Sequence, residues 1–253
     1  MIDTHCHLYS DELMPDLDAV LCRALEAGVR KFYLPAIDQA TTAAMLKVET
    51  LYPGKCFAMA GLHPCSVKSN YQEELEHIRD LLKQRSFAAI GETGLDFYWD
   101  TTYKKEQYLA LEKQVDMALE YKLPLVLHTR NAMQETIDVI KNYRQTPLKG
   151  IFHCFGGTTD EALQIIDCGF LLGIGGVVTY KNSKLPEVHT GIDMEHIVLE
   201  TDAPYLSPVP YRGKRNESSY ISEVAKKLAA IKNITVEEVD RITTGNAEKC
   251  FPV

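Results

Sequence analysis

Two histidines stand one residue apart near the start of the chain, in the run Ile2–His7. Alternate side chains of a β-strand point to the same side, so we expect His5 and His7 to share one face. Two neutral imidazoles at a strand end supply half of a divalent-metal site, whereas a single one is more often a hydrogen-bonded core residue. Cys6 lies between them and is expected to point the other way, so it is not a predicted ligand.

Other residues of metal-binding types follow short apolar runs further along the chain. Five of the eight histidines and three carboxylates occupy such positions. They are His5, His7, His63, His128 and His153, with Glu92, Glu200 and Asp202. If the runs are strands of one barrel, their carboxyl ends meet, and this clustering predicts a polar site rather than separate core histidines.

Short apolar runs alternate with amphipathic stretches over the whole chain. The runs lack strict polar alternation, which is typical of strands buried on both faces of a parallel sheet. They are Met1–Thr4, Lys31–Ile37, Cys56–Leu62, Phe87–Ile90, Leu125–Leu127, Gly150–Phe152, Phe170–Ile174 and Ile197–Leu199. Eight such units predict an α/β fold, a (β/α)8 TIM barrel of about 250 residues. The rival is a doubly wound open sheet, but the glycine-rich phosphate loop expected after its first strand is missing here.

Helical periodicity fills the stretches between these runs. Apolar residues at helical spacing precede Gly28, which suits the position just after a helix end; they are Leu17, Val20, Leu21, Ala24 and Leu25. Further helices are predicted over Thr102–Tyr121, Thr158–Cys168, Tyr220–Lys232 and Val236–Ile242. The irregular, basic stretch Pro208–Asn216 predicts a long loop after the last strand. Together these elements predict one barrel domain over residues 1–253.

The composition describes an acidic chain of ordinary hydrophobic content. With a net charge of −8, the molecule as a whole should repel nucleic acid, so a polyanionic substrate would need local cations or metal ions. Seven cysteines with no C-x-x-C pair favour a reducing compartment over a disulfide framework. With no signal peptide and no apolar run of membrane-spanning length, we expect a cytoplasmic protein without membrane contact or an obligate protein partner.

Six of the residues at predicted strand ends are expected to form a metal centre. Four imidazoles and two carboxylates exceed the three protein ligands of a usual open site, and they suit two ions. We assign His5, His7 and Asp202 to one ion, His128 and His153 to the other, and Glu92 to a bridging position. Two ions about 3.5–4 Å apart activate water and stabilise both oxygens of an in-line displacement at phosphorus. Asp202 is best placed to take the proton of that water, so Asp202 and Glu92 are the predicted catalytic residues.

Six short phrases stand at the predicted strand ends, in order along the chain. They are DTHCH (Asp3–His7), GLHP (Gly61–Pro64), GETGLDFYW (Gly91–Trp99), LHTR (Leu127–Arg130), FHCFGG (Phe152–Gly157) and ETDAPYL (Glu200–Leu206). Each phrase is weak alone, but the ordered set covers essentially the whole chain and resembles the signature of the TatD family. These are metal-dependent deoxyribonucleases of the amidohydrolase superfamily with a TIM-barrel fold. The resemblance implies DNA hydrolysis with 3′ to 5′ polarity and the same six ligands.

The expected cofactor is two divalent ions per chain, drawn from Mg, Mn and Zn. Imidazoles with carboxylates suit Zn, Mn, Co, Fe or Ni, whereas Mg prefers oxygen ligands. The resemblance implies a family usually described as Mg-dependent, so the tightest occupant and the activating ion are expected to differ.

Two positions depart from the family's pattern. Where the family often has a second histidine after the Gly-x-His-Pro phrase, this chain has Cys65. A loop that often reads Asn-Glu-Pro reads Asn216, Glu217, Ser218. Neither position is an assigned ligand, and both regions are expected to face substrate, so the departures bear on substrate preference.

Four residues are predicted substrate contacts, namely His63, Arg130, Arg212 and Arg215. His63 is either a phosphate contact or a hydrogen-bonded core histidine. The guanidinium of Arg130 matches a phosphate bidentately, the alternative being a salt bridge at the barrel mouth. Arg212 and Arg215 belong with Lys181, Lys184 and Lys214 to a basic set that forms either a cationic rim for nucleic acid or a solvated loop.

Several other residues have two interpretations. Glu200 is expected to orient a ligating histidine rather than to bind metal, and Asp3 either does the same or is structural. The aromatic run Phe97–Trp99 either stacks on bases or plugs the loop. Tyr205 has the same alternatives, and packing is favoured.

The leading hypothesis is a divalent-metal-dependent phosphodiesterase that trims DNA ends. A site at a barrel mouth favours a single strand or a strand end, because a base pair is hard to insert there. The alternatives are a D-aminoacyl-tRNA deacylase using the same metal site, another amidohydrolase acting on a lactone or amide, and a non-enzymatic metal-binding protein. The basic residues favour a phosphate-bearing substrate, and the complete ligand set favours an enzyme.

Overall fold

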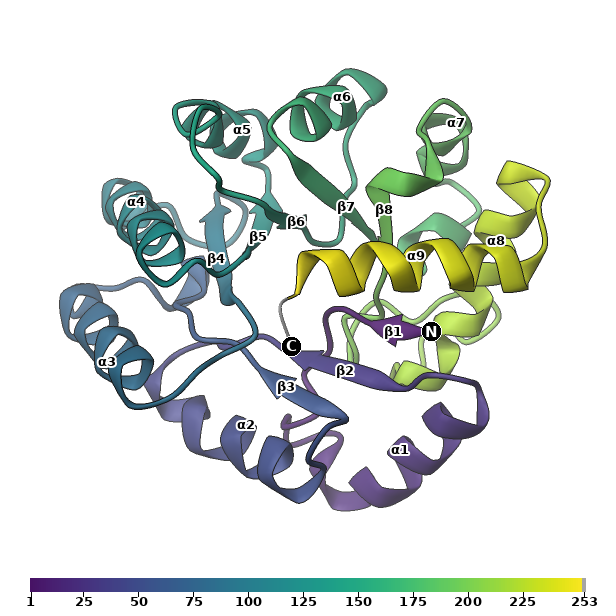
Figure 1. Ribbon diagram of the computed structural model, residues 1–253, viewed down its shortest axis with the longest axis horizontal. Helices are drawn as coiled ribbons and strands as arrows, with labels where there is room; N and C mark the ends of the chain where they lie inside the picture. The colour runs from purple at the N-terminus through teal and green to yellow at the C-terminus, as the bar shows by residue number, and fades with distance from the viewer. Residues whose placement is uncertain (252–253) are drawn as a thin grey trace.

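The computed structural model describes residues 1–251, and within them eight short parallel strands are surrounded by helices (Figure 1). The strands are β1 (Ile2–Asp3), β2 (Lys31–Leu34), β3 (Cys56–Ala58), β4 (Ile90–Asp96), β5 (Leu125–Arg130), β6 (Gly150–Phe152), β7 (Phe170–Ile174) and β8 (Ile197–Leu199). The strands form two hydrogen-bonded parallel sheets, one of β1, β2 and β3 and one of β4 to β8, and neighbours in each sheet follow chain order. Isolated bridges from Ala60 to Ile90 and from Cys6 to Ala203 join the two sets on both sides, which closes the predicted (β/α)8 barrel.

Helices follow the strands around the outside of the barrel. They are α1 (Leu17–Glu26), α2 (Gln39–Leu51), α3 (Tyr71–Gln84), α4 (Lys104–Tyr121), α5 (Met133–Lys141), α6 (Thr159–Asp167), α7 (Leu185–Thr190), α8 (Ile221–Lys232) and α9 (Val236–Cys250). Gly28, after α1, takes a φ of +87°, as a glycine beyond a helix end does. Thr158 caps α6 through a capping box with Glu161. Among residues 1–251, no helix combines the length and apolar character that crossing a bilayer requires.

Each predicted strand has an observed counterpart, but five of them differ in their bounds: β1 is shorter at both ends, β2 and β3 end earlier than predicted, β5 continues to Arg130, and β4 is displaced. β6, β7 and β8 match to the residue, whereas the expectation Phe87–Ile90 is wrong, because the strand begins at Ile90 and runs to Asp96. All residues of β4 are buried, including the polar Glu92 and Asp96. The apolar run in the sequence therefore ends at Ile90, where the strand begins. The predicted end of α9 at Ile242 is also wrong, since the helix continues to Cys250.

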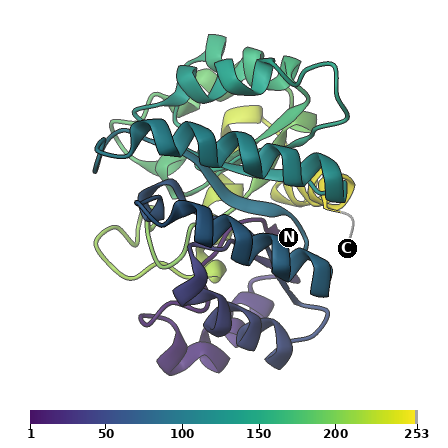
Figure 2. The same cartoon turned by 90° about the vertical axis from the view of Figure 1, so that its left-hand side faces the viewer.

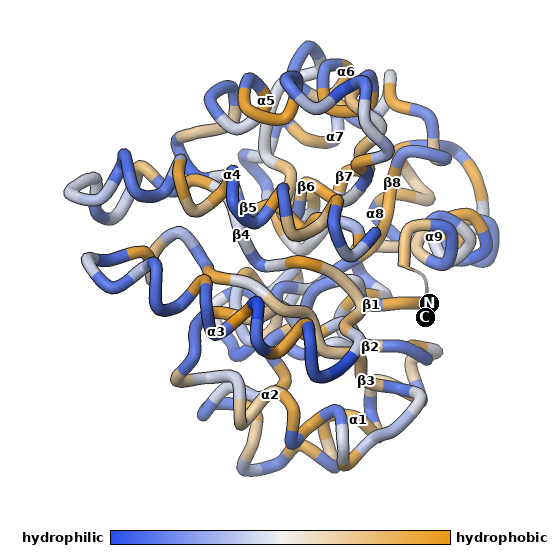
Figure 3. Tube along the Cα trace, turned by 60° about the vertical axis from the view of Figure 1, so that its left-hand side comes forward, coloured by the Kyte–Doolittle hydropathy of each residue, from blue (hydrophilic) through white to orange (hydrophobic). Residues whose placement is uncertain are grey.

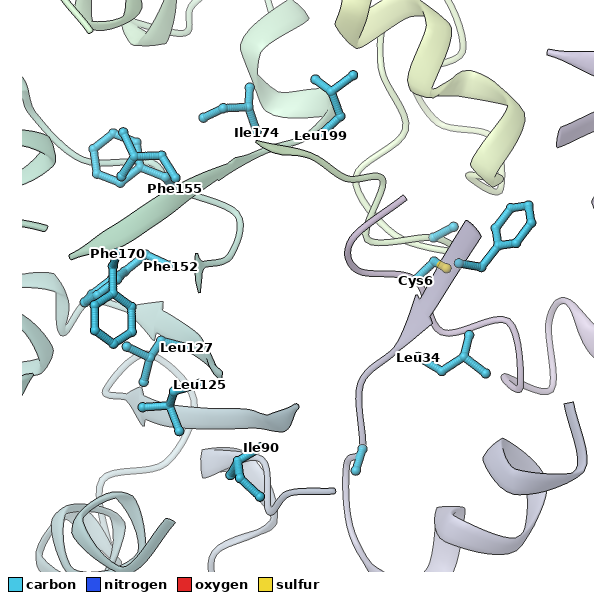
Figure 4. Packing of buried hydrophobic residues seen from close by; sticks show 14 of the residues in the cluster. Cys6, Leu34, Ile90, Leu125, Leu127, Phe152, Phe155, Phe170, Ile174 and Leu199 are labelled. Atoms are coloured by element: carbon cyan, nitrogen blue, oxygen red, sulfur yellow. The ribbon is translucent and has the colours of Figure 1, made fainter. Parts of the chain in front are cut away.

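Two apolar layers hold the barrel together. Between strands and outer helices, the rings of Phe152 and Phe170 pack 5.5 Å apart within a large buried cluster (Figure 4). A second cluster fills the barrel near the starts of the strands, where α9 covers it and Tyr33 stacks on Phe251 at 3.9 Å. In Figure 3 the strands β6 to β8 are largely hydrophobic, while the helices alternate between hydrophobic and hydrophilic residues. Because α9 covers one end, the polar residues gather at the other, where the strands end.

Candidate metal centre

All six predicted ligands lie within or just after strands and converge on one point. His5 and His7 follow β1, Glu92 belongs to β4 and His128 to β5, His153 follows β6, and Asp202 follows β8. His63, after β3, lies in the same group. The side chains are between 1% and 15% exposed, so the group lies below the surface of the barrel mouth.

The carboxylate of Glu92 lies at the centre of this group, with imidazoles facing both of its oxygens. Oε1 is 2.9 Å from His128 Nδ1, 3.0 Å from His153 Nε2 and 3.4 Å from His63 Nε2, and Oε2 is 3.1 Å from His5 Nε2 and 3.8 Å from His7 Nε2. Because each oxygen faces a different set of imidazoles, this is the placement that a carboxylate bridging two ions would need.

Asp202 lies on the side of the group formed by the start of the chain. Its Oδ1 is 3.7 Å from Nε2 of His5 and 3.5 Å from Nε2 of His7. The backbone of Asp202 takes a left-handed φ of +58°, and its N–H donates to the carbonyl of His5 at 2.9 Å. Asp3 also links the start of the chain to the segment after β8, because its carboxylate accepts the backbone N–H and the hydroxyl of Thr201. These hydrogen bonds therefore hold together His5, His7 and Asp202, the three residues predicted to bind one ion.

Hydrogen bonds behind two histidines fix which ring nitrogen faces the group. The hydroxyl of Tyr9 donates to a backbone carbonyl, so it accepts from Nδ1 of His7 at 3.0 Å and leaves Nε2 as a lone pair. Oδ2 of Asp96 accepts from Nε2 of His128 at 2.9 Å, which leaves Nδ1 facing the group. Such partners orient metal-ligating histidines and raise their basicity.

Asp96 is a candidate site residue that was not predicted from the sequence. It is buried at the end of β4, and Oδ1 accepts the backbone N–H groups of Tyr98 and Trp99 at 2.9 and 3.2 Å. These bonds fix the carboxylate that orients His128. A signal was available, because the residue four positions after Glu92 points to the same side of an extended strand.

His63 faces the group with an N–H donor rather than with a lone pair. Its Nδ1 accepts the backbone N–H of Cys65 at 3.0 Å, so the neutral ring carries its proton on Nε2. That nitrogen then faces Glu92 as a donor, and a protonated nitrogen does not ligate a metal ion. Although His63 groups with Glu92 and His128 by distance, this hydrogen bond favours the predicted phosphate contact over a ligand.

Glu200 lies behind His153, where a carboxylate that orients a ligand would lie. Its Oε1 accepts the backbone N–H of Cys154 at 2.5 Å and is 3.4 Å from Nδ1 of His153. This approach requires Gly173, because a Cβ there would lie 2.2 Å from Oε2 of Glu200. His153 also stacks on His5 at 3.8 Å, so the geometry places His153 beside both predicted ligand sets.

Burial and mutual charge set the protonation of the group. Burial raises the pKa of Glu92, but His153 and the other imidazoles around it hold that pKa well below its usual range. Burial also raises the pKa of Asp202, and its hydrogen bond with His7 and nearby positive charge leave it lowered. Burial lowers the pKa of His5. At His153 burial is outweighed, and the charge of Glu92 raises the pKa of the imidazole well above its usual range. The carboxylates are therefore in the ionised form that binds metal ions, and His153 would give up its proton to a bound ion.

The donor set fits divalent metal ions. Both ring nitrogens of His5 and Nδ1 of His153 are buried without a hydrogen-bond partner, which is costly unless another group satisfies them. Within residues 1–251, three groups of candidate ligand atoms lie within 4.8 Å of one another, and each includes His5 or Glu92. A cation among these atoms would satisfy Nε2 of His5, which faces Glu92, and would offset the charge of the carboxylates gathered there.

Arg130 lies at the rim of the site against exposed aromatic residues. Its guanidinium is 4.0 Å from the centre of the Tyr98 ring and 5.1 Å from that of Trp99. These side chains are 51% and 67% exposed, whereas Phe97 packs against the core. The exposure favours base stacking for Tyr98 and Trp99 and a plug for Phe97, and the cation–π contact replaces the salt bridge considered for Arg130.

The two other arginines predicted to contact substrate, Arg212 and Arg215, differ in the interactions they make within the protein. Arg212 lies 3.8 Å from the centre of the Tyr180 ring. Arg215 donates to both carboxylate oxygens of Asp16, at 2.6 and 2.8 Å, and to the carbonyl of Glu12. This pairing neutralises much of the charge of Arg215 and weighs against a direct phosphate contact.

Two expectations about the surroundings of the site are wrong. Asn216 and Ser218 are fully buried and Glu217 is only 5% exposed, so this loop presents little side-chain surface to a substrate at the metal centre. Asn216 donates to two carbonyls of the segment after β8, and Glu217 pairs with Arg23 at 2.6 Å, so these polar residues fasten the loop to the barrel. Tyr205, expected to pack, is 49% exposed.

Known proteins resemble this chain over its full length. The family model described as TatD related DNase matches residues 2–252. An uncharacterized metal-dependent hydrolase, YabD of Bacillus subtilis, is 36% identical over 100% of this chain and 99% of its own. The 3'-5' ssDNA/RNA exonuclease TatD of Erwinia billingiae is 29% identical over 99% of this chain and 98% of its own. The crystal structure of the TatD homologue YjjV from Escherichia coli K12, 28% identical, superposes with a TM-score of 0.94 over 100% of this chain and 98% of its own.

Proposed function

This chain belongs to the TatD-related DNase family and is a metal-dependent hydrolase of ester bonds, and on that premise we propose that it trims single-stranded DNA from its ends. The observation that carries the proposal is the buried carboxylate of Glu92, which lies within 3.8 Å of five imidazoles at the barrel mouth. A strand end enters such a site more readily than a base pair does. The relative named a 3'-5' ssDNA/RNA exonuclease supports this chemistry and a 3′ to 5′ polarity.

We propose that two divalent ions occupy the site. The ligands would be His5, His7 and Asp202 for one ion and His128 and His153 for the other, with Glu92 bridging. When bound, such ions lower the pKa of water and neutralise charge that develops on a phosphodiester. The imidazole-rich donor set favours manganese or zinc over magnesium as the tightest occupant.

The residues around the ligands position the reacting groups. Asp202, whose side chain is 14% exposed, accepts the proton of the attacking water. His63 donates from Nε2 to a phosphate oxygen, and Arg130 holds a neighbouring phosphate. Tyr98 and Trp99, beside Arg130, stack on the base of the terminal nucleotide.

The state of the cysteines supports the proposed cytoplasmic location. All seven lie within the described residues, and all are free thiols. Free thiols without a disulfide framework are typical of a reducing compartment.

A comparison of the wild type with Glu92→Gln tests this function. Both metal-loaded proteins receive end-labelled single-stranded DNA, duplex DNA and D-aminoacyl-tRNA. We expect stepwise loss of nucleotides from the single strand, slowed roughly a hundredfold or more in the variant because the group at the centre of the site is removed. Glu76→Gln, an exposed carboxylate on α3, is the matched control and should behave as the wild type.

Two results would contradict the proposal. Deacylation of the tRNA with the DNA left intact would assign a D-aminoacyl-tRNA deacylase instead. Equal activity of the wild type and Glu92→Gln would remove Glu92 from the site.

A further inference from the structure

A cavity of about 550 Å³ lies outside the metal centre, between α1 and the loop after β8. Its lining includes Arg23, Tyr211, Lys214, Arg215, Glu217 and Tyr220. In Figure 2 the yellow-green segment after β8 projects to the left, on the side away from the two chain termini. A cavity of this volume is within the range that binds small molecules or single nucleotides.

The cavity is tied to the strand end that bears Asp202. Asn216, between two of the lining residues, donates from its side chain to the carbonyls of Thr201 and Tyr205 at 2.8 and 2.6 Å. The ring of Tyr205 lies 5.9 Å from that of His7. The segment after β8 thus contacts the metal centre through Tyr205 and carries the lining residues of the cavity a few positions later.

Three cations line this cavity in a chain whose net charge is −8. Arg23 is paired with Glu217 at 2.6 Å and Arg215 with Asp16 at 2.6 Å, so acidic partners hold both guanidinium groups in place. Lys214 forms no ion pair with any residue in 1–251. Its ammonium is therefore the charge left to meet an anionic ligand.

Two tyrosines give the cavity an aromatic wall. The rings of Tyr211 and Tyr220 stack with centres 3.8 Å apart and planes 4° apart. Nζ of Lys214 lies 6.0 Å from the centre of the Tyr211 ring. Cations beside aromatic faces bind single-stranded nucleic acid, because the cation meets the phosphate while the ring stacks on the base.

We propose that this cavity binds a nucleotide of the substrate strand that lies beyond the one at the metal centre. Lys214 meets its phosphate, and the pair formed by Tyr211 and Tyr220 stacks on its base. The inference rests on the proposed action on single-stranded DNA and deepens it. It predicts tighter binding of strands that are long enough to span both positions.

Equilibrium binding of labelled oligothymidylates tests the cavity without any need for hydrolysis. Fluorescence anisotropy in the presence of a chelator gives the Kd for strands of two and ten nucleotides. We expect Tyr211→Ala to raise the Kd of the ten-mer roughly fivefold or more, and Tyr211→Phe to restore it. Lys214→Ala should lower the slope of log Kd against log salt concentration by about 0.7, the value for one phosphate contact on a single strand.

Lys226→Ala is the matched control, because Lys226 is an exposed lysine of α8 that faces Glu223. It should leave both the Kd and the salt slope of the ten-mer as in the wild type. Wild-type binding of the ten-mer by both Tyr211→Ala and Lys214→Ala, with unchanged melting curves, would overturn the inference. A wild type that binds the ten-mer through these residues but never shortens it would support the cavity and contradict the proposed function.

Discussion

The position of single protons distinguishes the histidines of the site. His7 and His128 donate hydrogen bonds to Tyr9 and Asp96, which leaves a lone pair on their inward nitrogens. The N–H that Cys65 donates to His63 instead leaves a proton on the inward nitrogen of His63. Imidazoles with an inward lone pair and one with an inward N–H therefore lie side by side around the carboxylate of Glu92. Metal binding and phosphate binding should be separable by substitution.

Replacement of His63 by phenylalanine should separate these roles. The change removes a donor but no ligand, so we expect unchanged metal content and a fall of roughly a hundredfold in kcat/KM on single-stranded DNA. Elemental analysis after dialysis, together with steady-state kinetics, measures both. His128→Phe is the matched change and should lose metal, while loss of an ion from His63→Phe would make His63 a ligand.

Asp96→Asn tests the support behind His128. The substitution keeps the size of the side chain but removes the charge that holds the proton on Nε2. Removal of such a partner costs about 10–100-fold in metal affinity or activity, and we expect a loss of that size in a metal titration of the rate. Asp100→Asn, an exposed aspartate nearby, should titrate as the wild type. An unchanged titration of Asp96→Asn would show that His128 does not depend on this carboxylate.

Among the elements, β4 shows where prediction from sequence stops. β6 to β8 were predictable to the residue because all three are apolar, with at most a glycine between hydrophobic residues. β4 was not, since it buries Glu92 and Asp96, and its polar sequence obscures a strand. The orientation of the histidine rings could not be predicted either, because Tyr9 lies in a turn and Cys65 in a short 3-10 helix, and the fold determines the positions of both.

The strand β7 leaves room for the carboxylate of Glu200 because residue 173 is a glycine. In Gly173→Ala the new Cβ would meet Oε2 of Glu200, so the carboxylate must move away from His153. Overpacking of this kind costs about 1–3 kcal/mol, and we expect a lower free energy of unfolding in urea together with reduced activity. Gly191→Ala has only ordinary contacts around its Cβ and is the control. Wild-type activity of Gly173→Ala would contradict a role for Glu200 in orienting His153.

The helix α7 should make folding sensitive to pH. His189 is fully buried, and neither ring nitrogen has a hydrogen-bond partner within residues 1–251. Burial, helped by the charge of Lys232, lowers its pKa from 6.5 to about 4. The unfolded chain therefore binds this proton more readily between these values. The contribution of His189 lowers stability by about 2 kcal/mol as the pH decreases from 7 to 5.

His189→Phe should remove this part of the pH dependence. Urea unfolding at pH 7 and pH 5 measures it, and His196→Gln, a partly exposed histidine, should keep the wild-type difference. If His189→Phe also kept that difference, another group would be the source.

For the molecule as a whole, local charge must overcome an acidic surface. The net charge of −8 opposes nucleic acid, so binding depends on the metal centre and on the few cations around it. The barrel and the convergence of the six candidate ligands were predictable, because these residues follow one another along the chain in the order of the strands. The cavity was not, since Arg23 and Lys214 meet only when the first helix and the last loop pack together.

The most direct test of the account is an anomalous diffraction map of crystals grown with manganese. The account predicts two peaks per chain, about 3.5–4 Å apart, with the carboxylate of Glu92 between them and His63 outside both coordination spheres. A single peak, or peaks that leave Glu92 without a metal contact, would contradict the central claim.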